Sequence, residues 1–493
     1  MTALIVTLGF VVLAVVLGLR ARRGKDMNLD QWAVAGRGFG GLFVFLLMAG
    51  EIYTTFTFLG APGWAYGKGA PALYIICYGA VAYLVSYWLL PAVWRFATRN
   101  NLHSQADFFV AKFDSPGLGV LVTLVGVIAL VPYLVLQLRG LGLIMSEASY
   151  GHVSYPVAVV IGTSVLALYV TVSGVHGSAW TAVVKDGVVL VVVLALGIYL
   201  PWHYFGGVAP MFRAVNAARP GFLTLPSTGM SPSWFVSTVL LSALGFYMWP
   251  HPFSASYTAR DERVFRRNAI VLPAYQLILL FVFFVGFAAV LVVPGLKGSD
   301  GDLSLLRITT ATFDPWFVGV VGGAGVLTAL VPGSLILTTA ATMLAKNIYK
   351  LARPTASDAS ISLAAKLLVP LLALVALYLT FDGGGTIVSL LLVGYSIVTQ
   401  LFPALLLSLS RRALVTRSGA VCGIVAGVAV VAVLTLSGLT LAGIAPWLPR
   451  SVTDLNVGVV ALVVNLVVLV VVTLLTRRRG VLRSGATDAV STS

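Results

Sequence analysis

Charge is scarce in this sequence, and that scarcity excludes most soluble folds. Charged residues make up 10% of the 493 residues and hydrophobic residues 59%, whereas soluble domains average about 25% charged and 45–50% apolar residues. A helix crosses a bilayer with about 20 mainly apolar residues. The chain therefore has room for a dozen or more membrane spans and for no sizeable soluble domain, so we expect an all-α polytopic membrane protein.

Cysteine and the signatures of enzyme chemistry are also rare or missing. The two cysteines, Cys77 and Cys422, lie inside apolar runs, which argues against a disulfide framework or a thiolate metal site. The sequence has no phosphate-binding loop, no HExxH pattern and no GxSxG nucleophile elbow. We expect no enzyme activity, no cofactor and no metal centre. The net charge of +15 does not predict nucleic-acid binding, because the basic residues are spread through short loops.

Thirteen long apolar runs are candidate spans. They lie at 3–20, 40–66, 71–92, 117–146, 155–173, 179–200, 234–250, 269–294, 316–345, 361–380, 386–408, 418–439 and 455–475. Alternate loops between them collect most of the Lys and Arg residues. By the positive-inside rule these loops face the cytoplasm of a bacterial inner membrane, which puts the N-terminus outside and the C-terminus inside. The Gly/Ser/Thr-rich tail at 480–493 is expected to be disordered.

Two of these runs contain helix-breaking residues. The run at 40–66 has Gly50 and a Gly-Ala-Pro-Gly sequence at 60–63, and the run at 234–250 leads into a Trp-Pro-His-Pro sequence at 249–252. A broken helix is tolerated in a membrane only where its freed backbone groups face protein or a water-filled cavity, so both breaks are candidate binding sites. Gly and Pro are also simply commoner in membrane helices. The spacing of five spans favours a binding site, because inverted repeats of five-plus-five helices place their discontinuous pair there.

Three ionisable residues lie deep within the runs. Glu51 follows Gly50 at the first break, and Lys185 and Asp186 lie in the run at 179–200. An ion at mid-membrane costs about 2.5–3.5 kcal/mol on insertion scales, so each needs a partner, a cavity or neutralisation. A desolvated carboxyl beside a helix break can bind a cation or hold a proton. The less favoured alternative is that Glu51 is a neutral carboxyl that bonds a neighbouring helix. Neighbours on a helix point about 100° apart, so Lys185 and Asp186 need not pair.

Polar and aromatic side chains near the breaks are candidate ligands for a small solute. They are Thr54, Thr55 and Thr57 after the first break, Phe246, Tyr247, Trp249 and His251 around the second, and Tyr133 and Gln137 on one face of the run at 117–146. Such residues suit the wall of a cavity, but they also serve as polar glue between membrane helices. Arg139 and Lys366 lie nearer the ends of their runs and are expected to extend toward the interface, with Arg139 also a candidate receptor for a carboxylate.

Several segments, in the expected order, resemble the sodium/solute symporter family over nearly the whole chain. They are Gly36-Arg37, Phe58-Leu59-Gly60 with Gly63, Ala106-Asp107-Phe108-Phe109 with Lys112-Phe113, Tyr169 to Gly174 with Trp180-Thr181, and Asn347-Ile348-Tyr349-Lys350. Within the family the chain is most similar to bacterial monocarboxylate permeases for acetate, propionate or pyruvate. That similarity rests on Glu51 before Ile52-Tyr53-Thr54, on the segment from Thr181 to Asp186, on Tyr247 to His251 followed by Arg266-Arg267, and on Leu330-Val331-Pro332.

The resemblance implies a LeuT-like core of two inverted five-helix repeats that works by alternating access. The implied division of the chain is a peripheral first helix with a basic inner loop at 1–38, a first repeat at 39–200, an outer loop at 201–233, a second repeat at 234–408, two peripheral helices at 409–479 and the tail at 480–493.

The family pattern is degenerate at its second sodium site. Sodium-coupled members use carbonyl oxygens of the first broken span, paired hydroxyl residues in the run at 316–345 and a nearby aspartate. A hard cation prefers oxygen ligands, and this chain has apolar residues at several of the matching positions, so the resemblance implies a weakened or absent sodium site. The degenerate sodium-site positions are Gly50, Tyr53, Ala182, Val331, Pro332 and Ser334.

Together these features predict a secondary transporter that imports a short monocarboxylate by proton symport. Glu51 is the expected coupling carboxyl, with Lys185 and Asp186 as modulators. The expected partners are the small-molecule solute, a co-transported proton or sodium ion and the lipid bilayer, and a small membrane subunit stays an open question. Sodium-coupled transport of another solute, such as an amino acid, is the alternative. A transporter-like sensor is a further alternative, disfavoured because no signalling module precedes the end at Ser493.

The loop charges generate a test of topology. A reporter fused after Ser493 should be active only in the form that works in the cytoplasm, because the last apolar run is followed by a cluster of arginines. Paired cytoplasmic and periplasmic reporters measure this, with fusions in the loop at 201–233 as the control of opposite sign. A periplasmic signal at Ser493 would contradict the count of spans.

Overall fold

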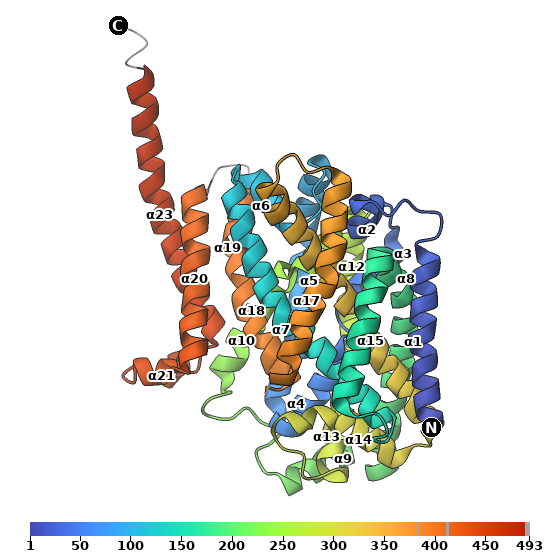
Figure 1. The fold of residues 1–493 in the computed structure, drawn as a ribbon. Coiled ribbons are helices and arrows are strands. Elements are labelled where there is room, and N and C mark those ends of the chain that lie inside the picture. The colour runs from blue at the N-terminus through green and yellow to red at the C-terminus, as the bar shows by residue number, and fades with distance from the viewer. Residues whose placement is uncertain (383–384, 411–413, 489–493) are drawn as a thin grey trace.

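Helices make up the architecture of this chain. The computed structural model describes residues 1–382, 385–410 and 414–488. Figure 1 shows a bundle of long helices between two opposite faces, with α1 (Thr2–Ala21) beginning at the lower face and α23 (Val457–Asp488) extending beyond the upper one. The one strand-like feature among the described residues is an isolated bridge between Phe39 and Ala259. The expected all-α membrane fold is confirmed.

In the described part of the chain, ten helices are long and apolar enough to cross a membrane. They are α1, α5 (Tyr74–Arg99), α7 (Pro116–Ala148), α8 (Tyr155–Phe205), α12 (Arg263–Gln276) continued by α13 (Leu279–Val292), α15 (Pro315–Leu344), α17 (Asp358–Asp382), α18 (Ile387–Val398) continued by α19 (Phe402–Ser408), α20 (Arg417–Ser437) and α23. Helix α8 corresponds to two of the predicted runs, because Gly174 interrupts it with φ 52° and ψ −149°, a conformation that glycine tolerates best. Together with two broken spans, these helices account for the thirteen runs.

The first broken span consists of α3 (Gly41–Gly50), a turn, a π-helical segment at Phe56–Gly60 and α4 (Ala61–Lys68). At the turn, the hydroxyl of Thr57 donates to the carbonyl of Ile52 and accepts from the backbone N–H of Thr54 at 3.1 Å. These bonds satisfy backbone groups that the break removes from the helical ladder, as the membrane interior requires. The break therefore lies where the sequence predicts it.

The second broken span consists of α10 (Pro232–Gly245), a 3-10 turn at Phe246–Met248 and α11 (Pro250–Ala255). Trp249 has extended dihedral angles, φ −60° and ψ 129°. This follows from the sequence, because a residue that precedes proline is disfavoured in the helical region. Pro250 then starts α11, where its missing N–H removes nothing from the ladder.

Helix α15 forms the centre of the bundle. In the most apolar stretch of the span that contains α15, 94% of the residues are buried inside the protein, compared with 22% for α1 and 28% for α23. A Cβ atom at Gly323 would lie 2.0 Å from the ring of Phe10, and one at Gly319 would lie 2.7 Å from the carbonyl of Ala3. Glycines thus let α1 pack closely against α15, a common arrangement between membrane helices.

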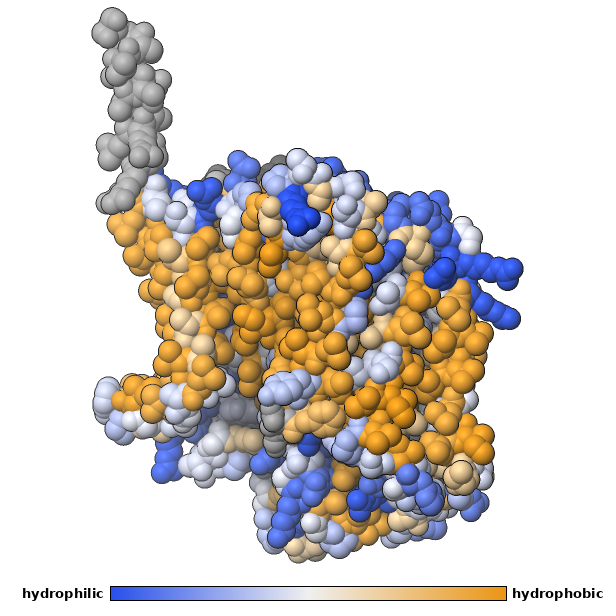
Figure 2. All heavy atoms as spheres, viewed as in Figure 1, coloured by the Kyte–Doolittle hydropathy of each residue, from blue (hydrophilic) through white to orange (hydrophobic). Residues whose placement is uncertain are grey.

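The ends of the bundle carry short helices and polar side chains. The short helices are α2 (Leu29–Val34), α6 (Gln105–Phe113), α9 (Val208–Ala218), α14 (Ser304–Thr312), α16 (Lys350–Ala352), α21 (Leu441–Ile444) and α22 (Arg450–Thr453). Figure 2 shows a broad hydrophobic zone across the middle of the face in view and hydrophilic residues toward both ends. This distribution is that of a protein which crosses a bilayer.

The C-terminal end differs from the prediction of a disordered tail at 480–493. The backbone of α23 stays helical to Asp488, and residues 489–493 lie outside the described part of the chain. A helix extends readily beyond a formed span, because each added residue contributes one backbone hydrogen bond once the nucleus exists. The division into repeats at 39–200 and 234–408 stays a prediction.

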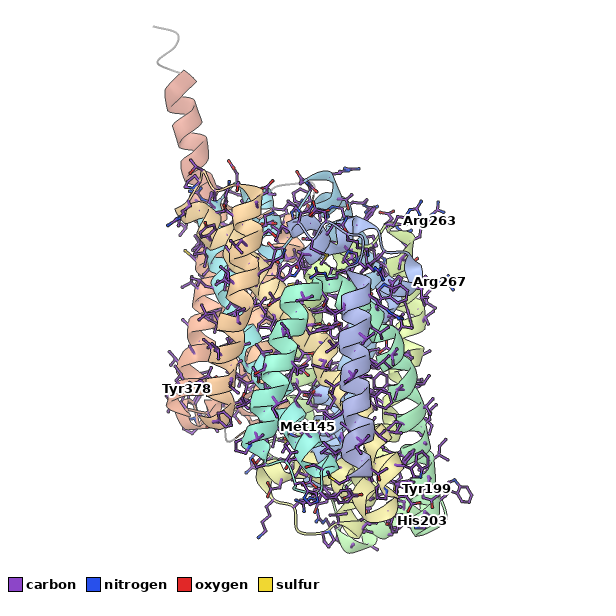
Figure 3. The ribbon with its side chains drawn as sticks, turned by 45° about the vertical axis from the view of Figure 1, so that its right-hand side comes forward. Met145, Tyr199, His203, Arg263, Arg267 and Tyr378 are labelled. Atoms are coloured by element: carbon purple, nitrogen blue, oxygen red, sulfur yellow. The ribbon has the colours of Figure 1, made fainter. Side chains whose placement is uncertain are left out.

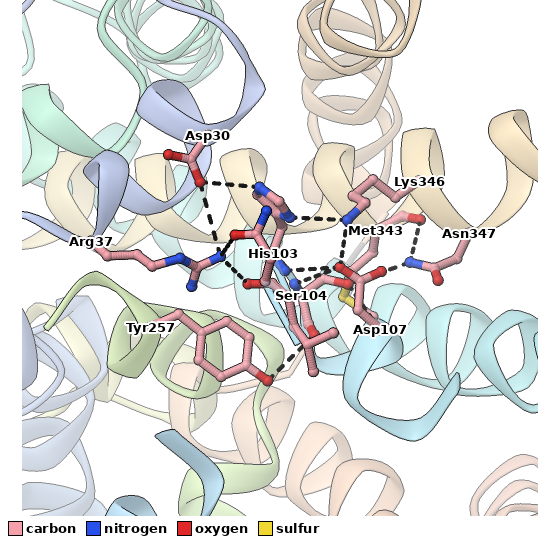
Figure 4. A network of polar contacts seen from close by, with 11 residues as sticks. Asp30, Arg37, His103, Ser104, Asp107, Tyr257, Met343, Lys346 and Asn347 are labelled. Atoms are coloured by element: carbon pink, nitrogen blue, oxygen red, sulfur yellow. Dashed lines mark hydrogen bonds and ion pairs between the residues drawn. The ribbon is translucent and has the colours of Figure 1, made fainter. Parts of the chain in front are cut away.

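A buried polar network fixes the loops at the upper face (Figure 4). Lys346 donates to Asp107 at 2.8 Å and lies 3.0 Å from Nδ1 of His103, while His103 Nε2 lies 3.1 Å from Asp30. Burial alone would raise the pKa of Asp107, but the charge of Lys346 and the N–H of His103 outweigh burial and hold that pKa below its usual value. Burial, followed by the charge of Lys346, lowers the pKa of His103 to about 4, so His103 is neutral at pH 7.

This network predicts a pH-dependent contribution to stability. Because Asp107 has a lowered pKa in the folded protein, its stabilisation is present above the unfolded pKa and is lost as pH falls through the folded value. Asp107→Asn should destabilise the protein at pH 7 by about 1–3 kcal/mol, and the difference from wild type should shrink below about pH 4. Thermal unfolding in detergent measures this. Lys346→Met serves as the control. Because Lys346 and Asp107 contact each other, the double variant should lose less stability than the sum of the losses in the two single variants.

Candidate functional site

The two helix breaks meet through one polar contact. Glu51 follows the last residue of α3, and His251 lies in the first turn of α11. Nε2 of His251 and Oε2 of Glu51 are 2.9 Å apart, and their side chains are 0% and 5% exposed. A hydrogen bond at this distance requires one proton between the two groups. Two spans that are distant in sequence are therefore joined by a protonatable pair.

A second contact joins the first break to α8. The ammonium of Lys185 donates to the carbonyls of Gly50 at 3.1 Å and Tyr53 at 3.2 Å. It also forms an ion pair with Asp186 at 2.8 Å. The sequence left open whether Lys185 and Asp186 pair. In the structure the long Lys185 side chain bends toward its neighbour while it reaches the freed carbonyls. All three acceptors are oxygen atoms in the buried interior.

The three threonines of the first break have different roles. Thr57 is committed to the backbone turn, as described above, and the Thr54 hydroxyl accepts from the backbone N–H of Phe56 at 3.2 Å. The Thr55 hydroxyl is buried without a hydrogen-bonding partner among the described residues. Its methyl group packs against Gly140 of α7, where a Cβ atom would lie 2.0 Å away. Thr55 is therefore the threonine whose side chain is free to bind another group.

Aromatic rings surround the Glu51–His251 pair. The ring of Tyr133 lies 4.9 Å from that of Trp249 and 5.1 Å from that of His251, and Trp249 lies 5.4 Å from Tyr395. The Tyr395 ring in turn lies 5.5 Å from that of Tyr78. The predicted residues Tyr133, Trp249 and His251 thus come together, whereas the sequence reasoning missed Tyr78 and Tyr395. Tyr78 is one of four tyrosines in the run at 71–92, and Tyr395 is the one tyrosine in the run at 386–408, so no sequence signal distinguished either of them from packing residues.

Phe246 and Tyr247 lie beside this group in the turn before the second break. Both are buried, and the ring of Phe246 contacts those of Tyr247, Tyr83 and Tyr78 at 5.0 to 6.3 Å. Phe246 therefore packs behind the Tyr78 side of the aromatic group.

Several buried polar atoms near the breaks have no hydrogen-bonding partner in the described part of the chain. They are Oε1 of Glu51, Nδ1 of His251, the hydroxyl of Thr55, both amide atoms of Gln137 and Nε1 of Trp249. Buried polar groups are nearly always paired, and each exception requires an explanation. Together these atoms offer both donors and acceptors beside aromatic walls, an arrangement suited to a small polar solute.

The degenerate sodium-site positions are apolar or already bonded. Ala182 and Val331 pack together with Leu46 in a small buried hydrophobic cluster. The Ser334 hydroxyl lies 2.5 Å from that of Ser178 and 2.7 Å from the Val331 carbonyl. Pro332 lies within α15 and supplies no hydroxyl. The carbonyls of Gly50 and Tyr53 bind Lys185. Thr338, a further hydroxyl of α15 near these positions, is buried without a hydrogen-bonding partner among the described residues.

The other charged residues of the spans lie away from this site. The guanidinium of Arg139 donates to the carbonyl of Gly385 ahead of α18. Lys366 donates to the carbonyl of Met27 at 2.8 Å, in the loop after α1. Both side chains therefore reach backbone groups in loops, as expected for residues near the ends of their runs.

A cavity of about 680 Å³ lies between α3 and α12. Its lining residues are Gly41, Leu42, Phe45, Arg263, Val264, Arg267, Asn268 and Val271. Figure 3 shows Arg263 and Arg267 at the edge of the molecule toward the upper face. On the inner side, the ring of Phe45 contacts that of Tyr275 at 6.0 Å, and Tyr275 contacts Tyr53 at 5.3 Å. An aromatic layer thus separates the cavity from the first break.

Comparisons with known proteins identify the family. The model of the sodium:solute symporter family matches residues 32–427. This chain belongs to that family. A symporter of Bacillus subtilis (strain 168), the uncharacterized symporter YhjB, is 60% identical to it over 486 residues, which is 99% of each chain. The monocarboxylate transport permease protein of Rhizobium johnstonii is 31% identical over 373 residues, which is 74% of this chain and 75% of that one.

A solved structure shares the fold of this chain. A sodium-coupled sialic acid symporter superposes with a TM-score of 0.77 at 18% identity, covering 96% of this chain and 98% of that one. At this identity the likeness shows the fold alone. The expected LeuT-like fold is confirmed, and in that fold solutes bind near the bilayer midplane at the discontinuous helices.

The different roles of the threonines generate a mutational test. Thr55→Val removes a hydroxyl that has no partner and keeps the shape of the side chain, so we expect it to leave thermal stability unchanged. If Thr55 binds solute, its loss should raise the apparent affinity constant for transport about tenfold, equivalent to ~1.4 kcal/mol. Thr57→Val should instead lower thermal stability, because it removes the bond to Ile52. Unchanged transport by Thr55→Val would exclude a role for this hydroxyl in solute binding.

Proposed function

We propose that this symporter imports a short monocarboxylate together with a proton, and that Glu51 carries the proton. The observation that carries the proposal is the buried contact between Glu51 and His251, which joins the two broken spans. In alternating access, discontinuous spans form the site that opens to each side in turn. A protonatable pair between them is therefore well placed to gain a proton from one side and lose it to the other.

The lining of the site supports a small anionic solute. The unpartnered donors of Gln137 and Trp249 are buried in the interior of the protein, and a carboxylate needs such donors when it leaves water. The rings of Tyr133 and Trp249 contact each other with their centroids 4.9 Å apart, so they form an apolar wall beside these donors. A relative that is 31% identical is named as a monocarboxylate permease, and its name agrees with this chemistry.

The residues at the sodium-site positions support a proton over sodium as the coupling ion. Sodium binds oxygen ligands, and Ala182 and Val331 supply none. Ser334 is bonded to Ser178 and to its own helix, which leaves the unpartnered hydroxyl of Thr338 as the alternative ligand on α15. Sodium-coupled symport of another solute, such as an amino acid, is the second candidate, because the fold is shared with a sodium-coupled symporter.

The proposed orientation places the cavity at Arg263 and Arg267 on the cytoplasmic side. The loops at the upper face carry most of the basic residues, and this excess supports a cytoplasmic location. The cavity is then the inner vestibule, from which a solute released at the breaks would leave after the aromatic layer at Tyr275 and Phe45 moves.

Uptake into liposomes tests this function. An imposed inward pH gradient should drive accumulation of labelled acetate, propionate or pyruvate, whereas a sodium gradient at equal pH should not. Glu51→Gln should reduce gradient-driven accumulation by at least about tenfold while exchange of internal for external solute continues, because exchange needs no net proton transfer. Glu147→Gln is the matched control, since Glu147 pairs with Arg307 at 3.0 Å away from the breaks. Uptake that depends on sodium alone and is indifferent to Glu51→Gln would refute the proposal.

A further inference from the structure

Among the ion pairs of the described residues, Lys185 is the one lysine with a completely buried side chain, 0% exposed. Its ammonium lies within hydrogen-bonding distance of three oxygen atoms, which belong to Gly50, Tyr53 and Asp186. Two of these are backbone carbonyls freed by the break of the first span. The third is a buried carboxylate on the same helix as the lysine.

The Lys185 ammonium and the oxygen atoms around it each need the other as a partner. A buried ammonium has three donors and no acceptor, and it is tolerated in a membrane only with such oxygen partners. The carbonyls at the C-terminal end of α3 carry partial negative charge and need a cation or donor in turn. Each side of the contact therefore satisfies a requirement of the other.

The same three oxygens form a set that a hard monovalent cation would also bind. Two carbonyls and one carboxylate are ligands of the kind that hard cations prefer. The ammonium lies where such an ion would have to lie to reach the first break and α8 together. One turn before Lys185 on α8, Ala182 packs with Val331 and Leu46 in an apolar cluster that offers no further ligands.

We infer that Lys185 is a tethered cation that fills the carbonyl site of the first broken span permanently, so that no sodium ion binds there during transport. The side chain provides the positive charge that holds the end of α3 against α8. The site is thus built as a cation site, with its cation covalently attached to the chain. The inference rests on these contacts and requires neither the identity of the solute nor a role for Glu51.

The inference predicts that sodium will bind once the tethered cation is removed. Lys185→Ala leaves the carbonyls of Gly50 and Tyr53 and the Asp186 carboxylate without their cation. We expect sodium chloride, compared with choline chloride at equal ionic strength, to raise the melting temperature of purified Lys185→Ala saturably, by at least about 2 °C, because a ligand that binds only the folded state stabilises it. The wild type should show no such difference.

Two further variants make the experiment specific. Lys185→Met keeps the volume of the side chain without its charge, so it should lose stability and stay insensitive to sodium because the site remains filled. Lys366→Ala is the matched control, since Lys366 also donates to a backbone carbonyl, that of Met27, but away from the breaks. It should melt at the same temperature in both salts.

The outcomes decide the inference without any solute. A sodium-specific rise in the melting temperature of the wild type would overturn it, because the site would then accept sodium while Lys185 is present. A Lys185→Ala protein that folds and shows no response to sodium would also overturn it. If Lys185→Ala cannot be purified, Lys185→Ser provides the same opened site with one added oxygen. Sodium chloride should then raise the melting temperature of Lys185→Ser, and a lack of response would overturn the inference. Failure of the proposed monocarboxylate transport would leave these melting temperatures unaffected.

Discussion

The requirement that every backbone polar group in a membrane finds a partner governs this structure. Unbroken spans meet it within themselves, but the breaks at Glu51 and Trp249 release carbonyls and N–H groups that water cannot reach. Side chains supply the missing partners at the first break. Thr57 bonds the turn from within the span, and Lys185 bonds it from α8. The features that make the site a binding region are therefore the same ones that allow the span to be broken.

Satisfying the first break also determines which helices are joined around the site. Lys185 attaches the end of α3 to α8, and the Glu51–His251 contact attaches it to the second broken span. Behind these contacts, α15 is packed closely on all sides, with Gly319 and Gly323 in contact with α1. The site thus lies between elements that are linked by a few polar contacts and a helix that is held by close packing. We expect movements during transport to break the polar contacts and to preserve the close packing of α15.

The sequence predicts the fold well and the site only in part. Span positions and both breaks follow from hydropathy and from Gly50, Pro250 and their neighbours, since these signals are local along the chain. Contacts between distant residues are not local, so neither the pairing of Glu51 with His251 nor the reach of Lys185 to two carbonyls was predicted. The tyrosines missed at the site have the same explanation, because an aromatic residue in an apolar run looks like any other packing residue until its neighbours are known.

The attachment of the positive charge at Lys185 has a consequence for energetics. A sodium ion that crossed in addition to the carboxylate and its proton would carry one net positive charge, and each charge moved through 100 mV changes the free energy by about 2.3 kcal/mol. A charge fixed to α8 stays with the protein. A monocarboxylate that crosses with one proton is then an electroneutral load, so the membrane potential neither assists nor opposes its uptake. Accumulation would follow the pH difference alone, and cells that use this symporter would take up such acids fastest in acidic surroundings.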